Sequence, residues 1–154
     1  MRAPAGKLRV ELRPHTSGSE LLELRVLNEP SGEKLAIVIF ANIQDRRGRI
    51  ILSFRDQNTV APLRQKRLMT LIHLFLIHRY KASSIHYVTP NEDNQLQAAR
   101  MKSLGIFSDV HTEIGQIIVA HIGTQVVADL LKPDRSALAE MIRKTSPQMV
   151  GTLG

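Results

Sequence analysis

The sequence predicts a single α+β domain in which a mixed, mostly antiparallel central sheet is flanked by helices. Strand-like runs with apolar residues fill the first third of the chain, and turn-forming residues interrupt them. The remainder carries apolar stripes at helical spacing between shorter strand-like runs. A length of 154 residues suits one domain with its own core.

Four strands are predicted at the start of the chain. They cover residues 7–13, 21–28, 34–43 and 49–54, and segments rich in Pro, Gly and Ser separate them. Gly48 lies in the polar connection before the fourth strand and favours a hairpin there. The four strands are therefore expected to form an antiparallel meander.

Two helices with a strand between them are expected next. The longer helix covers residues 61–82, carries a one-sided apolar stripe and has Pro62 in its first turn. The strand after it ends at Pro90, and Asn91 is placed to cap the second helix. Gly105 is placed to close that helix in a left-handed turn.

The last elements are a hairpin and a helix. Residues 107–122 are interpreted as two strands that meet near Gly115, and Asp134 is placed to cap a helix over residues 135–144. The boundaries that follow are 1–6 for a flexible N-terminus, 7–145 for the domain and 146–154 for a flexible C-terminal tail.

The amino-acid composition limits the classes of function that this chain can have. The formal net charge of +7 suits an anionic partner, such as nucleic acid or a phosphorylated cofactor. The absence of cysteine excludes disulfides, thiolate nucleophiles and cysteine metal sites. No long apolar run or signal core is present, so a cytoplasmic protein without a membrane segment is expected. Histidine spacing predicts no metal site, because His73 and His78 diverge on their helix.

The predicted order of elements resembles the fold of the GCN5-related N-acetyltransferases (GNAT). Asn94 and Gly105 match the family pattern N-x-x-A-x-x-L-Y-x-x-x-G-F. Gln97 stands at the alanine of this pattern, Met101 at its tyrosine and Ile106 at its final aromatic residue. The resemblance implies a GNAT-like sheet whose strands bearing Phe54 and Tyr87 splay apart around the pantetheine arm of a coenzyme A (CoA) thioester.

The segment before the long helix resembles the family's pyrophosphate-binding loop. Val60 and Arg64 match that loop, whereas Arg67 and Met69 fill two glycine positions and restrict the approach of an anion to the backbone. The cations Arg64, Lys66 and Arg67 could replace lost backbone contacts, or they could form a solvated first helical turn. The resemblance implies acetyl- or propionyl-CoA as ligand, bound by Val60, Arg64, Gln65, Lys66, Arg67, Leu68, Met69, Thr70, Asn91, Asn94 and Met101.

The residue at position 101 matters for catalysis, because the GNAT pattern has a tyrosine there. GNAT enzymes usually protonate the departing thiolate with a tyrosine at this position, and a thioether cannot donate that proton. Tyr80 or Tyr87 could substitute, although both suit core positions. Glu92 and Asp93 could act as bases, although the helix dipole alone favours acids in a first turn. The resemblance therefore implies no catalytic residue in this chain.

A closer resemblance covers residues 89–122 and 130–144, which are similar to the C-terminal GNAT-like domain of long-form isocitrate lyases of the mycobacterial type. In that family the domain dimerises and binds acetyl- or propionyl-CoA to regulate the lyase. The lyase reaction itself is not expected here, because it needs a barrel of about 200 residues or more and a cysteine.

Several functions remain open at this point. The first is a catalytically degenerate acyl-CoA sensor that forms a homodimer and regulates a partner enzyme or domain. The second is an active N-acyltransferase that uses acetyl-CoA. A basic nucleic-acid-binding domain and a dimerisation module are further alternatives, although no recognisable nucleic-acid motif is present.

Overall fold

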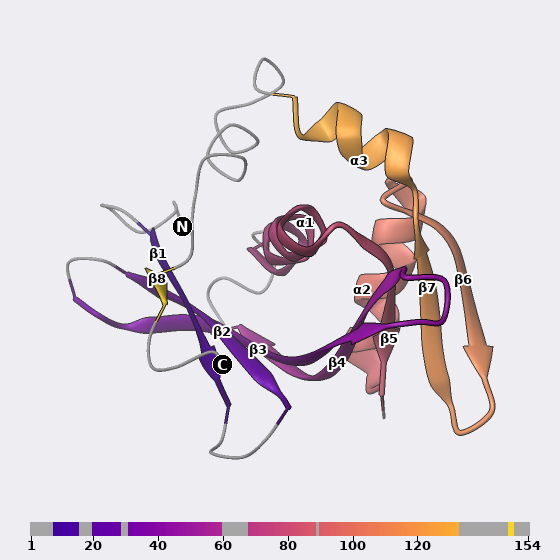
Figure 1. The fold of residues 1–154 in the computed structure, drawn as a ribbon. Helices are drawn as coiled ribbons and strands as arrows, with labels where there is room; N and C mark the ends of the chain where they lie inside the picture. Colours follow the sequence, from indigo (N-terminus) through magenta and orange to yellow (C-terminus); the bar gives the residue numbers. More distant parts are fainter. Residues whose placement is uncertain are drawn as a thin grey trace. The chain divides into compact units, whose positions relative to one another are not determined.

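Helices and strands follow one another largely as the sequence predicts, from the N-terminal strands to the closing hairpin (Figure 1). This computed structural model describes residues 8–15, 20–28, 31–59, 68–88, 90–132 and 148–149.

The chain divides into two compact units, and two strands pass from one unit into the other. These strands are β3 (Lys34–Gln44) and β4 (Ile50–Thr59). The first unit comprises Met1–Ala41, Arg55–Met69 and Ser146–Gly154, and the second comprises Asn42–Phe54 and Thr70–Thr145.

The first unit is built from β1 (Leu8–Pro14), β2 (Leu22–Asn28), most of β3 and the short β8 (Gln148–Met149). β1 pairs antiparallel with β2, and β2 pairs antiparallel with β3. β8 lies in the segment expected to be a flexible tail, and it pairs parallel with β1. Leu24 and Phe40 are among the side chains that form the core of this unit.

Glu23 is a buried acid in the first unit, with only 3% of its surface exposed. Its carboxylate accepts hydrogen bonds from the Nε atoms of Arg13, at 3.2 Å, and Arg25, and it lies 3.0 Å from Nδ1 of His15. Burial raises the pKa of Glu23, but these hydrogen bonds and the charge of Arg25 outweigh burial and lower the pKa below its ordinary value. Glu23 is therefore charged at neutral pH and joins β1 to β2.

The second unit places a parallel strand pair beside an antiparallel hairpin (Figure 1). β4 pairs parallel with β5 (Ala82–Tyr87), and α1 (Leu68–Tyr80) connects them. β5 pairs antiparallel with β7 (Ile117–Ile122), which pairs antiparallel with β6 (Phe107–Glu113). The predicted fold class, a mixed and mostly antiparallel sheet with helices, is confirmed.

The ends of α1 and β4 differ from the prediction. α1 ends at Tyr80, before the predicted end at residue 82, because Lys81 has a φ of 52° and leaves the helical conformation. Residues 61–67 of the predicted helix lie outside the described residues. β4 runs on to Thr59, beyond the predicted end at Phe54, because strand formation depends on backbone pairing and tolerates the polar side chains there.

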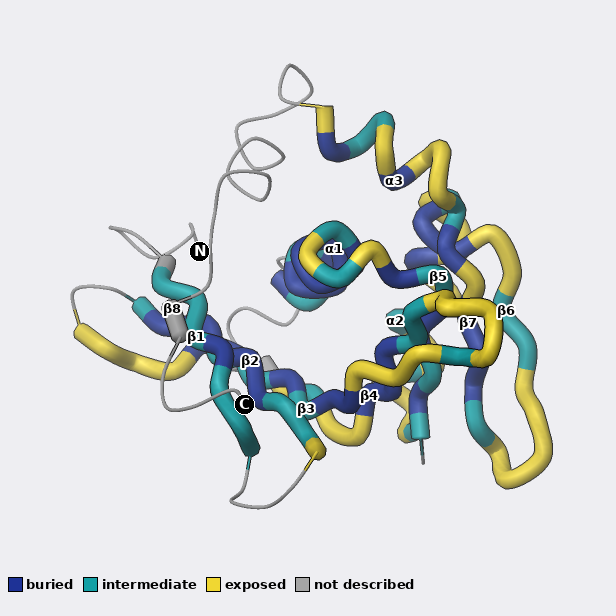
Figure 2. The backbone as a smooth tube through the Cα atoms, in the orientation of Figure 1, coloured by how far each residue is buried: buried dark blue, intermediate teal, exposed yellow. Residues whose placement is uncertain are grey.

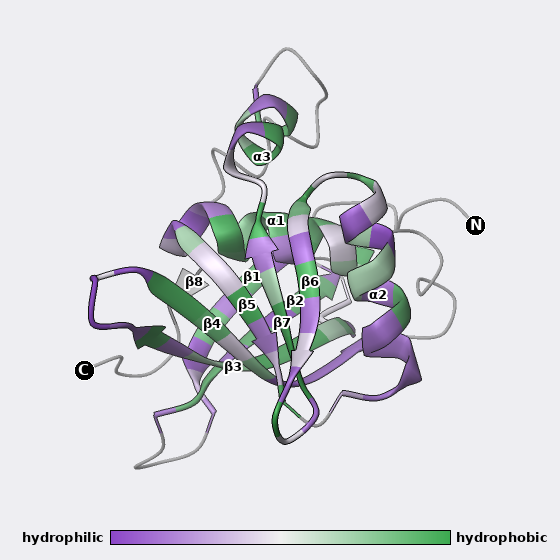
Figure 3. Ribbon diagram, turned by 90° about the vertical axis from the view of Figure 1, so that its right-hand side faces the viewer, coloured by the Kyte–Doolittle hydropathy of each residue, from purple (hydrophilic) through white to green (hydrophobic). Residues whose placement is uncertain are grey.

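α2 (Glu92–Ser103) begins and ends as predicted. Asn91 is its N-cap, and the backbone N–H of Asn94 donates to Oδ1 of Asn91 at 2.8 Å. Gly105 follows the helix with a φ of 80°, which favours glycine. Only Ala98 and Met101 of α2 are buried, in agreement with the largely hydrophilic colouring of this helix in Figure 3.

α1 and α2 lie against the same face of the strands of the second unit. Phe54, Tyr87 and Ile118 share this face by register, and the His73 ring of α1 lies 4.9 Å from the Phe54 ring. α2 contacts β6 on that face. α1 is mostly buried, whereas the turn between β6 and β7 is exposed (Figure 2).

A third helix, α3 (Thr124–Leu130), is an element that the prediction missed. Its seven residues are too few to give a clear helical period in the sequence. The helix predicted over residues 135–144 lies outside the described residues. None of the described helices has the length and apolar character that a membrane span requires.

Gly123, just before α3, is expected to tolerate no side chain. A Cβ atom at this position would lie 2.3 Å from the carbonyl oxygen of Gly105, and backbone at both positions would have to move. Gly123→Ala should lower the free energy of unfolding by about 2 to 3 kcal/mol, through overpacking. Denaturant titration measures this loss, and Gly115→Ala is the control, because a Cβ atom at Gly115 would meet no atom within 4 Å. The free energy of unfolding of Gly115→Ala should fall by only about 1 kcal/mol, because alanine is strained in the left-handed backbone conformation there. Equal losses in the two variants would contradict the steric argument.

Candidate functional site

The start of α1 contains the predicted phosphate-binding residues that the structure describes. Thr70 is buried, and its Oγ1 atom accepts a hydrogen bond of 2.9 Å from Nε2 of Gln97 on α2. Gln97 stands where the GNAT pattern has alanine, so this departure links the two helices. Leu68 is buried and Met69 is half-buried. Val60, Arg64, Gln65, Lys66 and Arg67 lie outside the described residues.

Asn91 and Asn94 form a capping box at the start of α2. Each side-chain oxygen accepts the other residue's backbone N–H, at 2.8 Å for Asn91 Oδ1 and 3.0 Å for Asn94 Oδ1. This arrangement satisfies two otherwise unpaired donors of the helix N-terminus. Both residues therefore have a structural role, and their contact with a cofactor stays a prediction.

Met101 is completely buried, with 0% of its surface exposed. Its sulfur is a weak hydrogen-bond acceptor and carries no proton, so this side chain cannot act as a proton donor. Tyr80 is half-buried, and burial raises the pKa of its phenol. The role of Met101 beside a thioester stays a prediction.

A buried aromatic cluster occupies the end of the paired part of β4 and β5. Nε2 of His73 lies 2.8 Å from the hydroxyl of Tyr87, and Phe54 and Phe107 pack against these two rings. Tyr87 is 1% exposed, and burial raises its pKa well above the ordinary value. The Tyr87 hydroxyl therefore stays protonated at neutral pH, and its bond with His73 satisfies a buried polar pair.

The pairing of β4 with β5 ends at Phe54 and Tyr87, and one further bond joins the Val88 N–H to the Phe54 carbonyl at 3.0 Å. β4 continues for five more residues, to Thr59. On this extension, Oε1 of Gln57 is buried and has no hydrogen-bond partner among the described residues. Buried polar atoms are normally satisfied, so Gln57 is a candidate ligand contact that the sequence analysis missed.

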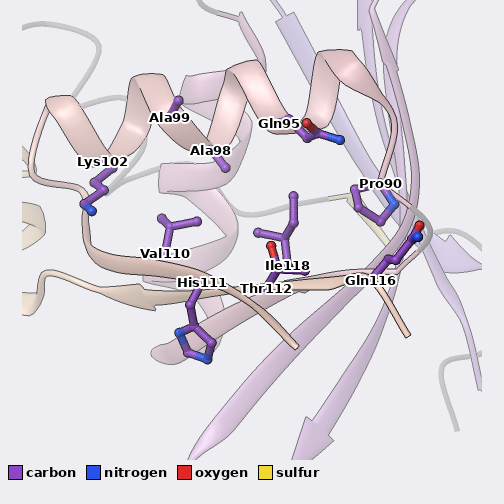
Figure 4. A pocket seen from close by; sticks show the side chains of 10 residues that line it. All are labelled: Pro90, Gln95, Ala98, Ala99, Lys102, Val110, His111, Thr112, Gln116 and Ile118. Atoms are coloured by element: carbon purple, nitrogen blue, oxygen red, sulfur yellow. The ribbon is translucent and has the colours of Figure 1, made fainter. Parts of the chain in front are cut away.

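A pocket of about 620 Å³ lies between α2 and the hairpin of β6 and β7 (Figure 4). Ala98 of α2 faces Val110 and Ile118 of the hairpin, so the floor is apolar. Of the predicted cofactor residues that the structure describes, none lines this pocket. Its lining consists of Pro90, Gln95, Ala98, Ala99, Lys102, Val110, His111, Thr112, Gln116 and Ile118.

The opposite face of the hairpin carries a cluster of charged and imidazole side chains. His111 points away from α2 in Figure 4 and lies between two acids, with Nδ1 at 3.2 Å from Asp109 Oδ2 and Nε2 at 3.1 Å from Glu113 Oε2. The hydrogen bond to Glu113 and then that to Asp109 raise the pKa of His111. His121 of β7 stacks on the His111 ring, with the ring centroids 5.5 Å apart.

His86 of β5 lies on the same face of these strands, because it pairs with Val119 next to His111. Burial lowers the pKa of His86, although the charge of Glu113 opposes this shift. Histidine pairs at helical spacing do not indicate this cluster, because its residues lie on strands. The signal was the alternation D-V-H-T-E over residues 109–113, which puts three polar side chains on one face of a strand.

Comparison with known sequences finds relatives that are named as isocitrate lyases or as a subunit of one, whereas no family model matches the chain. The chain is 60% identical over 139 residues to a protein of Mycobacterium tuberculosis named as an isocitrate lyase subunit, a match that covers 90% of this chain and 35% of the relative. It is also 60% identical to isocitrate lyase 2 of Mycobacterium tuberculosis, over 90% of this chain and 18% of the relative. The chain therefore spans about a third or less of the length of these relatives.

Comparison with solved structures supports the fold alone. The crystal structure of a KacTA–DNA complex matches with a TM-score of 0.53 and 7% sequence identity, over 80% of this chain and 98% of the matched chain. The observed order of a strand meander, helix, strand, helix and closing hairpin is the GNAT order that the sequence resembles. The arrangement of elements is therefore GNAT-like.

Proposed function

We propose that this chain, which is homologous to a segment of isocitrate lyase 2 and has a GNAT-like fold, binds an acyl-CoA and regulates an isocitrate lyase. The observation that carries the proposal is the 60% identity over 139 residues with proteins named for that lyase. The proposal gives this chain a binding role and assigns the lyase reaction to none of its residues. The proposed ligands are acetyl- and propionyl-CoA, the proposed assembly is a homodimer, and the proposed location is the cytoplasm.

Two features of β4 fit the pantetheine arm of such a ligand. The β4 backbone continues beyond its last pair with β5, at Phe54 and Tyr87, and an extended chain of amides can pair with a strand edge. The buried Oε1 of Gln57 on this extension lacks a partner among the described residues and could accept an amide N–H. In the proposal, Arg64, Lys66 and Arg67 bind the pyrophosphate through charge-assisted hydrogen bonds.

The same residues favour binding without transfer. Acetyl transfer to an amine needs a proton donor for the departing thiolate and an acceptor for the amine proton. Met101 stands at the position of the family's tyrosine and cannot donate. The proposed role of this chain is therefore that of a sensor, which keeps the thioester intact.

A second candidate function is an active N-acyltransferase, and the bond between His73 and Tyr87 favours it. Met101 cannot protonate the departing thiolate, but the phenol of Tyr87, next to the imidazole of His73, could do so. Both residues are almost completely buried, so this chemistry would require an opening of the aromatic cluster.

Titration calorimetry and free-thiol release test the proposed function together. Acetyl- and propionyl-CoA should bind, whereas thiol release with a panel of amines should stay near the uncatalysed background. Met101→Leu should leave both results unchanged, because leucine conserves the volume of the buried side chain. Sedimentation analysis of the same samples should give a dimer.

Two results would contradict the proposal in different ways. Saturable binding of nucleic acid but not of any CoA ester would favour the basic surface as the functional feature. Robust thiol release in the native chain and in Met101→Leu would assign the proton donor to another residue. Loss of that release in Tyr87→Phe would then identify the buried cluster as catalytic.

A further inference from the structure

The exposed face of the β6–β7 hairpin brings together three side chains that can each donate one atom to a metal ion. Asp109 and His111 lie on one face of β6, because side chains two residues apart in a strand share a face. The register places Asp109 opposite His121 of β7. The ligand atoms of these three residues all lie within 4.8 Å of one another. We propose that Asp109, His111 and His121 form a binding site for a divalent transition-metal ion of the Zn²⁺ type.

The spacing of two donors already suits such an ion. Ligands at 2.0–2.2 Å from a tetrahedral Zn²⁺ ion are about 3.3 to 3.6 Å apart. Oδ2 of Asp109 and Nδ1 of His111 are 3.2 Å apart. His121 is exposed, so its ring can turn toward the other two donors without disturbing the core.

Glu113 supplies a second, separate argument. Histidines that bind metals usually donate their other ring N–H to a carboxylate, which fixes the ring orientation. Oε2 of Glu113 lies 3.1 Å from Nε2 of His111, on the far side of the ring from Asp109. This contact leaves Nδ1 of His111 as the atom that binds the metal.

The donor types select the class of ion. Two imidazoles and one carboxylate match Zn²⁺ and related ions, whereas Ca²⁺ and Mg²⁺ prefer oxygen ligands alone. Three protein ligands leave one tetrahedral position for water. His86 lies on the neighbouring strand but outside the group of donors within 4.8 Å, so the proposal gives it no coordinating role.

Metal titration of the full chain without a purification tag tests the site. Zn²⁺ should bind with one equivalent per chain and raise the melting temperature by roughly 4 °C at saturation. Co²⁺ should give the visible absorption of a tetrahedral complex with nitrogen and oxygen ligands. The double substitution His111→Asn with His121→Asn should abolish both signals, and Glu113→Gln should weaken Zn²⁺ binding about 10- to 100-fold.

The matched control is His86→Asn, which removes a histidine from the same face and should change the Zn²⁺ affinity less than twofold. Retained binding in the double variant, or an equal loss in His86→Asn, would overturn the assignment. No Zn²⁺ binding to the native chain would also overturn it. Circular dichroism of each variant checks the fold. The metal site is independent of the proposed acyl-CoA function, so Zn²⁺ binding should persist when Arg64, Lys66 and Arg67 are replaced.

Discussion

Replacing Arg64, Lys66 and Arg67 together by alanine should weaken acetyl-CoA binding about 1,000-fold or more. Each charge-assisted hydrogen bond to a phosphate contributes about 1.5 to 3 kcal/mol. Three such bonds at the lower end give about 4.5 kcal/mol, and each 1.4 kcal/mol changes the dissociation constant tenfold. Titration calorimetry at fixed ionic strength measures the change.

The control for this prediction removes the same charge elsewhere. Lys34, Arg46 and Arg47 are exposed, so their joint replacement by alanine leaves the proposed phosphate contacts intact. Salt screens distant exposed charges, and the affinity should change less than about threefold at 0.15 M salt. Equal losses in the two triple variants would assign the effect to net charge and would make the segment before α1 a solvated helical turn.

Glu23→Gln should lower the free energy of unfolding by about 3 kcal/mol. Removing one partner of a buried ion pair costs about 3 to 5 kcal/mol. The lower end is expected, because the side chains of Arg13, His15 and Arg25 are 32%, 32% and 28% exposed and water can rehydrate them. Denaturant titration at pH 7 measures the loss. The control is Glu11→Gln, which removes a more exposed pair with Arg9 and should cost less than about 1 kcal/mol.

The contribution of Glu23 to the free energy of unfolding should depend on pH. The folded-state pKa of Glu23 lies below its ordinary value of 4.5, so its contribution is present above pH 4.5. The contribution disappears as the pH falls through the lower, folded-state pKa. The stability difference between the native chain and Glu23→Gln should therefore shrink below pH 4.5. A difference that stays constant down to about pH 2 would show that packing, rather than charge, explains the loss.

Local sequence signals determined much of the architecture. Asn91 and Gly105 marked the ends of α2 because capping and a left-handed turn need particular residue types at single positions. The meander and the hairpin followed from runs of strand-forming residues between turn residues. The end of α1 was less predictable, because Lys81 adopts a positive φ that its residue type does not indicate.

The candidate sites, too, were only partly predictable from the sequence. The sequence pointed to the cationic segment at residues 64–67 and to the substitution at Met101, because both can be found by comparison with a linear pattern. It could not show that the side chain of Gln97 bonds to Thr70, or that His73 bonds to Tyr87. Each of these bonds joins residues from different helices or strands.

The sequence by itself therefore determined the fold class, the resemblance to GNAT domains and the residues expected at a phosphate group. Only the tertiary structure decided that His111 and His121 come together with Asp109, and that Glu23 meets three basic side chains. The physical reason is that capping, turns and strand-forming runs depend on neighbours along the chain. A cluster of donors depends on strand register, which the pairing of separate strands sets.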